Sequence, residues 1–111
     1  MKKIPNDHYT YRIIWSQEDS EYVGLCVEFP SLSWLSNSPE AALKGIRSTV
    51  AEVVNDMSAN HETLPVPLSE KNFSGKFMVR IPPESHRKLA VEAAEEGVSL
   101  NRLASFKLTQ T

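Results

Sequence analysis

The chain has 111 residues and a formal net charge of −2, with 41% hydrophobic and 23% charged side chains and a single cysteine. Such a length suits one ordinary domain or two small ones. No apolar run approaches the roughly 20 residues of a membrane helix, and one cysteine excludes an internal disulfide. The basic start, Met1-Lys2-Lys3, precedes no apolar stretch, so we expect no secretion signal, no membrane association and a cytoplasmic protein.

The charged residues are unevenly distributed along the chain. Residues 1–70 hold five Lys or Arg and ten Asp or Glu, whereas residues 71–111 hold seven and four. One interpretation is chance. The other is a basic tail that binds a polyanion and an acidic front that binds something else. Charge alone does not choose between them.

Alternating hydrophobic side chains predict strands in the first half. Residues 9–15 are rich in aromatic and β-branched side chains with period two, and residues 21–29 alternate in the same way, with a polar hairpin loop between them. Residues 32–35 predict a short third strand. The apolar face of the second strand is expected to consist of Val23, Leu25, Val27 and Phe29.

One long helix follows these strands. Ser38 is a suitable N-cap and Pro39 suits the first helical position. We expect the helix to end near Asn60 and to cover one face of the sheet. Its apolar stripe consists of Leu43, Ile46, Val50, Val53, Val54 and Met57.

The remaining residues predict a linker and a second small unit. Residues 63–74 lose periodicity and read as a linker, with Leu64–Leu68 as a candidate edge strand. Residues 75–82 alternate as a strand. A helix then runs from Pro83 to a stop at Gly97, and a final helix is capped by Ser99. The apolar stripes of these helices are Leu89, Ala90, Ala93 and Ala94, then Leu100, Leu103, Ala104 and Leu108.

The tail is too small to fold alone. About 40 residues with one lone strand and two short helices bury too little apolar surface, and the strand leaves its backbone groups unpaired. Two copies solve both problems if their strands pair antiparallel. The dimer core would then contain Phe77, Val79 and Ile81, and the outer face would present Lys76, Met78 and Arg80 from each chain.

A paired strand of this kind suits DNA. A two-stranded ribbon fits the major groove, where Lys and Arg reach guanine acceptors and phosphates. The free N–H groups at the start of the last helix, at Ser99, Leu100 and Asn101, would clamp a phosphate. The alternative for Lys76 and Arg80 is a merely solvated strand face.

These residues resemble the ribbon-helix-helix repressors, through the strand that exits at Arg80-Ile81-Pro82 and the turn Gly97-Val98-Ser99-Leu100-Asn101. The resemblance implies base reading by the outward strand residues. Met78 stands where the family usually has a polar side chain, so contact with a thymine methyl replaces a hydrogen bond there.

The chain as a whole resembles the HicB antitoxins. The resemblance rests on ordered segments, among them Tyr22-Val23-Gly24, Glu28-Phe29-Pro30, Ser38-Pro39-Glu40, Leu64-Pro65-Val66-Pro67 and Ser74-Gly75-Lys76-Phe77. It implies a front domain like part of ribonuclease H and a partner, the HicA toxin, that cleaves messenger RNA. The loop Ser36-Asn37-Ser38 departs from the family's usual Gly-Asp-Thr but keeps a capping hydroxyl.

Catalysis and metal binding are not expected. The acids of the front half are concentrated near the hairpin loop and do not converge from separate strands as a two-metal site requires. His8, His61 and His86 lack metal-ligand spacing, and Cys26 has no neighbouring base, so an inert thiol is expected. Trp34 has two open interpretations, a core residue or an interface anchor. The acids considered are Asp7, Glu18, Asp19, Glu21 and Glu28.

The sequence therefore predicts an α+β protein with no enzymatic activity and no cofactor. Residues 1–62 would form a toxin-binding domain with a small antiparallel sheet and one helix, residues 63–74 a linker, and residues 75–111 a ribbon-helix-helix domain. Its expected partners are a HicA-like toxin, operator DNA and a second copy of itself, or a higher oligomer. Two alternatives remain: a stand-alone repressor whose front half oligomerises or senses a ligand, and a degenerate enzyme.

Overall fold

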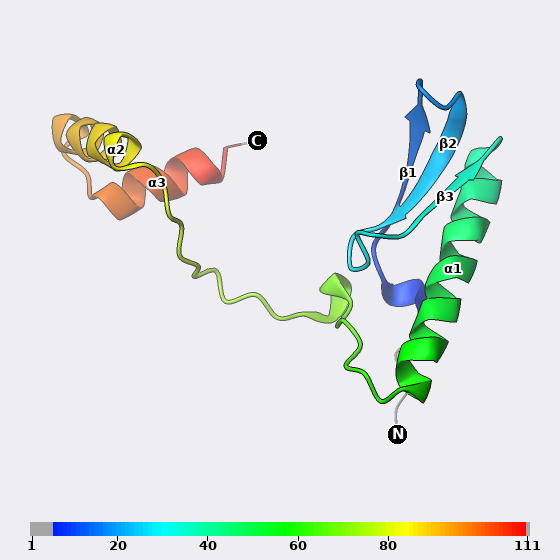
Figure 1. Ribbon diagram of the computed structural model, residues 1–111. Helices are drawn as coiled ribbons and strands as arrows, with labels where there is room; N and C mark the ends of the chain where they lie inside the picture. Colours follow the sequence, from blue (N-terminus) through cyan, green and yellow to red (C-terminus); the bar gives the residue numbers. More distant parts are fainter. Residues whose placement is uncertain (1–5, 111) are drawn as a thin grey trace. The chain divides into compact units, whose positions relative to one another are not determined.

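The computed structural model describes residues 6–110. Segment 1–5, where we expect no secretion signal, lies outside the described residues. By its internal contacts the chain divides into two compact units, with the boundary after Phe73. Each unit is coloured along the sequence in Figure 1 and is described by itself below.

The first unit is an antiparallel sheet with a helix along one face (Figure 1). The strands β1 (Tyr11–Ser16), β2 (Glu21–Cys26) and β3 (Ser33–Ser36) lie in that order, and α1 (Pro39–Ala59) contacts all three. Short 3-10 turns, η1 (Asn6–His8) and η2 (Leu68–Glu70), lie before and after these elements. The fold class is α+β, as the sequence predicts.

The local signals that begin α1 are confirmed. The Ser38 hydroxyl accepts a hydrogen bond from the backbone N–H of Ala41 at 3.1 Å, and Pro39 occupies the first helical position. The hydroxyl thereby satisfies one of the free donors of the first turn. The helix ends one residue before Asn60, close to the predicted position.

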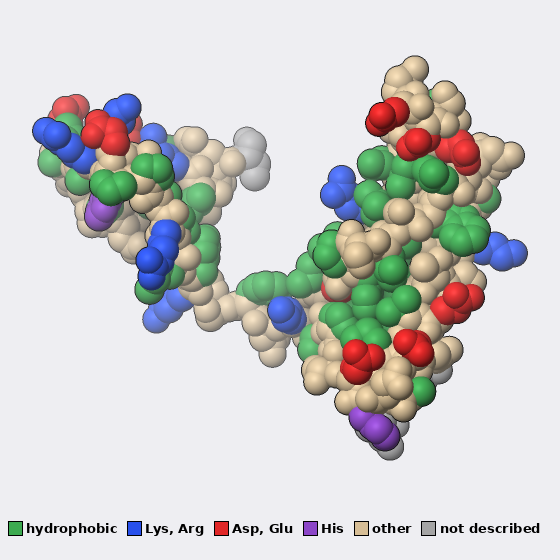
Figure 2. Space-filling model, viewed as in Figure 1, with side chains coloured by type: hydrophobic (Ala, Val, Ile, Leu, Met, Phe, Trp, Pro, Cys, Tyr) green, Lys and Arg blue, Asp and Glu red, His purple; other side chains and the backbone are tan. Residues whose placement is uncertain are grey.

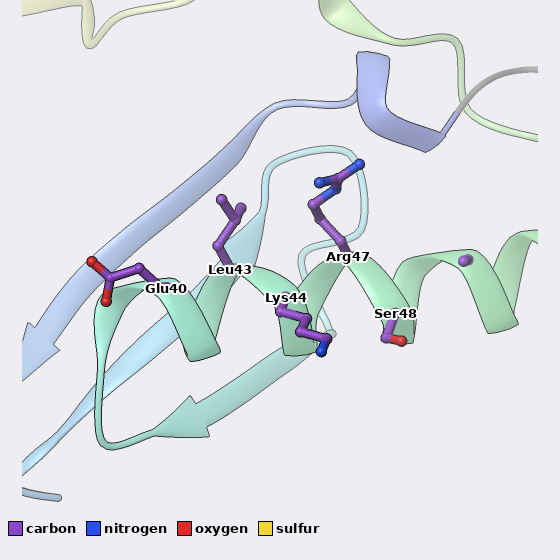
Figure 3. Close-up of a pocket in the computed structure, with 6 residues that line it drawn as sticks. Glu40, Leu43, Lys44, Arg47 and Ser48 are labelled. Carbon is purple, nitrogen blue, oxygen red and sulfur yellow. The ribbon is translucent and has the colours of Figure 1, made fainter.

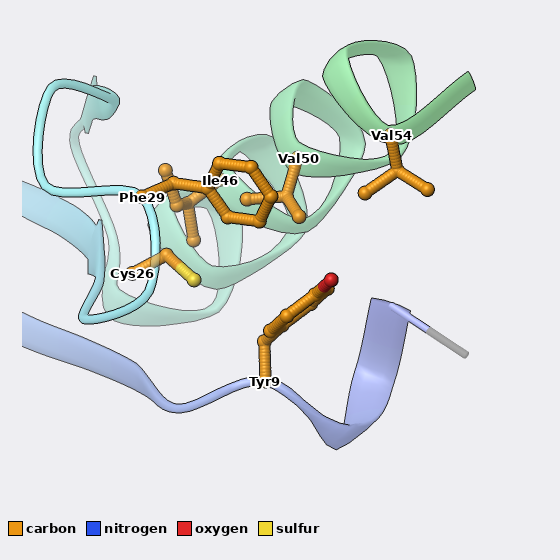
Figure 4. Packing of buried hydrophobic residues seen from close by; sticks show 6 residues of the cluster. All are labelled: Tyr9, Cys26, Phe29, Ile46, Val50 and Val54. Carbon is orange, nitrogen blue, oxygen red and sulfur yellow. The ribbon is translucent and has the colours of Figure 1, made fainter. Parts of the chain in front are cut away.

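The core lies between the sheet and α1. Tyr9, Cys26 and Phe29 pack there against three helix residues, and Figure 4 shows the six side chains converging. The rings of Tyr9 and Phe29 meet edge to face at 5.1 Å. Val53 and Met57 pack at the margin of this cluster, whereas Leu43, the first residue of the predicted stripe, is 37% exposed and lies outside it. The three helix residues are Ile46, Val50 and Val54.

The buried face of β2 is the opposite of the one expected from its alternating hydrophobic residues, of which only Phe29, beyond the end of the strand, is buried. Gly24 and Cys26 are buried against α1, whereas Val23 and Leu25 are only half-buried on the other face. Gly24 decides this arrangement: a Cβ there would lie 2.5 Å from the Ala42 carbonyl oxygen and 2.9 Å from Ile46 Cγ2. The helix approaches β2 because that strand position has no side chain.

The predicted edge strand at Leu64–Leu68 is wrong. No strand is present between α1 and Ser74, and the segment instead ends in the turn η2. Pro65 and Pro67 lack the N–H groups that a strand ladder needs. The segment is held on the first unit by other contacts, among them the Tyr9 hydroxyl, which donates to the Pro65 carbonyl at 2.7 Å.

The second unit consists of two helices, α2 (Pro83–Glu96) and α3 (Leu100–Leu108). Their predicted boundaries are confirmed: Gly97 ends α2 with a φ of +69°, and the Ser99 hydroxyl accepts from the Arg102 N–H at 3.0 Å. Lys107 pairs with Glu92 at 3.0 Å. Of the predicted apolar stripes, Ala93 and Leu103 are buried. No strand is present at residues 75–82 in the single chain.

We predict that Gly24→Ala lowers the free energy of unfolding of the first unit by about 1–3 kcal/mol, because the added methyl group forces α1 away from β2. Both tryptophans, Trp15 and Trp34, lie in this unit, so their fluorescence in a urea titration reports its unfolding. Ser48→Ala, on the exposed side of α1, is the control and should change stability by less than about 0.5 kcal/mol. Equal stability of the two variants would contradict the packing argument.

Candidate functional site

The candidate DNA-reading residues all lie in the segment that precedes α2. Lys76, Met78 and Arg80 are exposed, and Met78 is 86% exposed. Gly75, with a φ of +84°, makes the turn into this segment. The exposed positions give the three side chains free access to a partner, which a base-reading role requires.

The residues expected to form the dimer core belong to the same segment and are also exposed. Phe77 is 74% exposed, and Val79 and Ile81 are exposed as well. Within residues 74–110, Ala93 and Leu103 are the buried hydrophobic residues. Phe106 and Leu108 leave further apolar surface uncovered. A single copy of the described tail therefore has very little core.

The candidate phosphate clamp lies at the start of α3. Ser99 uses its hydroxyl as the N-cap, and its carbonyl accepts from the Leu103 N–H at 3.0 Å. An α-helix leaves its first N–H groups without partners within the helix. Leu100 and Asn101 occupy these first positions, where their N–H groups carry the positive end of the helix dipole.

The Glu28 carboxylate joins three parts of the first unit, a role that the sequence analysis missed. It accepts hydrogen bonds from the Thr10 N–H at 2.9 Å, the Thr10 hydroxyl at 3.0 Å and the Leu68 N–H at 2.9 Å. It therefore holds the segment around Leu68 against the strand ends. No local pattern marks this role, because the partners lie 18 and 40 residues away.

These contacts change the pKa of Glu28. Partial burial acts to raise the pKa, but the hydrogen bonds from Leu68 and Thr10 outweigh it and lower the pKa below the ordinary value of 4.5. The neighbouring Cys26 is buried, which raises the pKa of its thiol. Cys26 is therefore a core residue with little thiolate character, in agreement with the inert thiol expected from the sequence.

The candidate acids and histidines do not form a metal site in the part of the chain that is described. No group of three His, Cys, Asp or Glu side chains within residues 6–110 could hold a metal ion. Glu18, Asp19 and Glu21 lie at the β1–β2 hairpin, while Glu28 is bound to Thr10 and Leu68. The three histidines are exposed as expected, and His8 pairs with Glu70.

Trp34, for which the sequence left a core and an interface role open, packs on α1. A Cβ on Gly45 of α1 would lie 2.0 Å from its Cδ1 atom, so the indole packs directly on the helix backbone. The side chain is nevertheless 46% exposed. Trp34 thus packs on the helix backbone while much of the residue stays exposed, and its role as an interface anchor stays a prediction.

The helix α1 also carries a candidate pocket, most of whose lining residues are charged or polar. Figure 3 shows a shallow depression along this helix, which Glu40, Leu43 and Lys44 line together with Arg47 and Ser48. It lacks the enclosed apolar walls of a small-molecule site. In a separate finding, no helix within residues 6–110 is long and apolar enough to cross a membrane.

Residues 59–108 match the model of the HicB family. The match begins at the end of α1 and runs through α3, over 50 of the 111 residues. This part of the chain is therefore similar to the HicB family, whose members are generally components of toxin–antitoxin systems. Comparisons with curated proteins and with solved structures gave no match.

We predict that Glu28→Gln lowers the free energy of unfolding of the first unit at pH 7 by about 1 kcal/mol, because charged hydrogen bonds to Thr10 and Leu68 are replaced by weaker ones. A lowered pKa in the folded state stabilises the fold above pH 4.5, and this contribution is lost as the pH falls through the lowered pKa. The difference between wild type and variant should therefore shrink in acid.

Urea titrations at several pH values, followed by tryptophan fluorescence, measure that difference. Glu52→Gln on the exposed side of α1 is the matched control and should match the wild type at pH 7. Hydrogen exchange at pH 7 should show faster exchange around Leu68 only in Glu28→Gln. A constant difference between wild type and Glu28→Gln across the acid range would contradict the role given to the carboxylate.

Proposed function

We propose that this chain is the antitoxin of a type II toxin–antitoxin system. The first unit binds and neutralises a HicA-like toxin that cleaves messenger RNA, and the tail represses the chain's own operon by binding operator DNA. The observation that carries the proposal is the HicB match over residues 59–108. The proposal gives the chain no catalytic role and no cofactor.

Dimerisation of the tail follows from its exposed apolar side chains. Within the described tail, Ala93 and Leu103 are buried while Phe77, Val79 and Ile81 are exposed. A second copy would cover these three residues and would pair the backbone groups of residues 75–82, which have no strand partner in one chain. Two chains are thus the smallest unit with a complete tail core.

DNA binding follows from the opposite side of the same segment. Side chains alternate along a strand, so pairing through Phe77 and Val79 turns Lys76, Met78 and Arg80 outward from both chains. The ribbon then fits the major groove. The N–H groups of Leu100 and Asn101, next to the Ser99 cap, are suited to bind the phosphate backbone.

We predict that Arg80→Ala abolishes operator binding and leaves the dimer intact, because the side chain is outward-facing and supplies both charge and base contacts. A gel shift with the operator at a fixed, stated salt concentration measures binding, since phosphate contacts weaken steeply with salt. Lys44→Ala removes one positive charge from the first unit and is the control. Full binding by Arg80→Ala would exclude the ribbon.

Phe77→Ala should instead dissociate the dimer and thereby also abolish DNA binding, because it removes the largest side chain of the proposed dimer core. Sedimentation measures the oligomeric state. Met78→Ala, the adjacent position on the other face, should stay dimeric and is the matched control. A dimeric Phe77→Ala variant would contradict the core assignment.

The antitoxin role is tested by co-expression of this chain with a HicA-like toxin, to be sought as a small basic protein encoded by the neighbouring gene. We expect the two proteins to co-purify and the chain to restore growth that the toxin stops, because binding blocks the ribonuclease. Loss of both effects would reject the antitoxin role. Operator binding that persists in that case would leave the stand-alone repressor as the remaining function.

A further inference from the structure

The face of the sheet that α1 leaves uncovered is rich in hydrophobic side chains. Residues paired directly across an antiparallel ladder share a face. The pairs Ile14–Val23 and Val23–Leu35 place three hydrophobic residues together, and Leu25 continues the same face along β2. Val27, the residue after β2, extends the pairing with β1 through its N–H, which donates to the Thr10 carbonyl at 2.9 Å. We call this surface the open sheet face and define it by Ile14, Val23, Leu25, Val27 and Leu35.

The exposure of these side chains shows that the first unit does not cover them. Ile14, Val27 and Leu35 are 41%, 42% and 46% exposed, and α1 packs on the other face through Gly24 and Cys26. A contiguous exposed apolar surface of this kind is typical of an interaction site. The α1 surface in Figure 3, by contrast, contains Leu43 and Ala51 among four charged or polar residues.

Acidic side chains lie at one end of the open sheet face. Glu21 pairs with Ser16 on this face, and Glu18 and Asp19 occupy the adjoining hairpin. Figure 2 shows acidic side chains over the hairpin end of this unit, next to hydrophobic ones. One cation, Arg12, also lies on the face, opposite Leu25. Residues 6–73 as a whole hold ten Asp or Glu and four Lys or Arg.

We propose that the open sheet face is the surface on which the first unit binds its toxin, a small basic protein that itself binds RNA. This inference rests on the antitoxin function proposed above. A ribonuclease needs a cationic surface for phosphates, and such a surface complements the acids at the hairpin. The hydrophobic centre supplies the apolar contact area that a stable interface requires.

The acidic residues of the first unit disfavour two other partners for the open sheet face, namely a nucleic acid and a second copy of the unit. RNA or DNA would bring phosphates against Glu18, Asp19 and Glu21, which repel them. A second copy of the first unit would bring the same surplus of negative charge. A basic protein is the partner whose charge is opposite to that of the unit.

The test compares Leu35→Lys with Leu43→Lys in the full-length chain. Both leucines are partly exposed, at 46% and 37%, and both substitutions add one positive charge to the first unit. Leu35 lies on the open sheet face, whereas Leu43 lies on α1, which packs on the other face of the sheet. We expect Leu35→Lys to weaken toxin binding by about tenfold or more, as for a central interface residue, and Leu43→Lys to bind as the wild type does.

Calorimetry with the purified toxin measures affinity, and tryptophan fluorescence confirms that each variant is folded. Val27→Lys, at the far end of the face, provides a second variant if Leu35→Lys fails to fold. If the wild type binds toxin and the folded open-face variant binds equally well, the inference is wrong while the antitoxin function stands. If the wild type itself binds no toxin, the proposed function fails as well.

Sedimentation of the chain without toxin tests whether a second copy of the chain, rather than the toxin, covers the open sheet face. We expect wild type, Leu35→Lys and Leu43→Lys to have the same oligomeric state. A lower oligomeric state for Leu35→Lys alone would identify a second copy as the occupant of the open sheet face and would overturn the proposal. Unchanged operator binding by all three proteins would further support a site confined to the first unit.

Discussion

The first unit depends on the close approach of α1 to β2 at Gly24. The position of a Cβ there lies 2.5 Å from the Ala42 carbonyl oxygen, a distance that no side chain could occupy. Because the backbones come this near, Cys26 and Ile46 are almost fully buried in a small sheet-and-helix unit. The same contact decides which face of the sheet is covered, since Val23 and Leu25 alternate with Gly24 and must point away from the helix.

Sequence patterns predicted the features that depend on neighbouring residues. The caps at Ser38 and Ser99 and the stop at Gly97 were predicted correctly because each is a local hydrogen bond or backbone conformation. The three strands of the first unit and the three α-helices followed from periodicity, apart from small differences at their ends. Periodicity could not identify the covered face of β2, because Gly24 contributes no hydrophobicity to the pattern although it permits the closest contact.

Features that depend on distant residues or on a second chain were not predictable in the same way. The segment Leu64–Leu68 looked like an edge strand, yet Tyr9 and Glu28 hold it by single hydrogen bonds to Pro65 and Leu68. The candidate DNA-reading residues could be predicted only as an alternating segment. Their strand needs a partner strand, and a single chain supplies none.

DNA binding by the tail and toxin binding by the first unit are both proposed from an apolar surface that a single chain leaves exposed. The charges beside that surface differ between the units. Lys76 and Arg80 alternate with the uncovered residues of the tail, whereas Glu18, Asp19 and Glu21 lie beside the open sheet face. Phosphates are attracted to the first arrangement and repelled by the second. The distribution of charge would therefore confine DNA to the tail and leave the front free for a basic protein while DNA is bound.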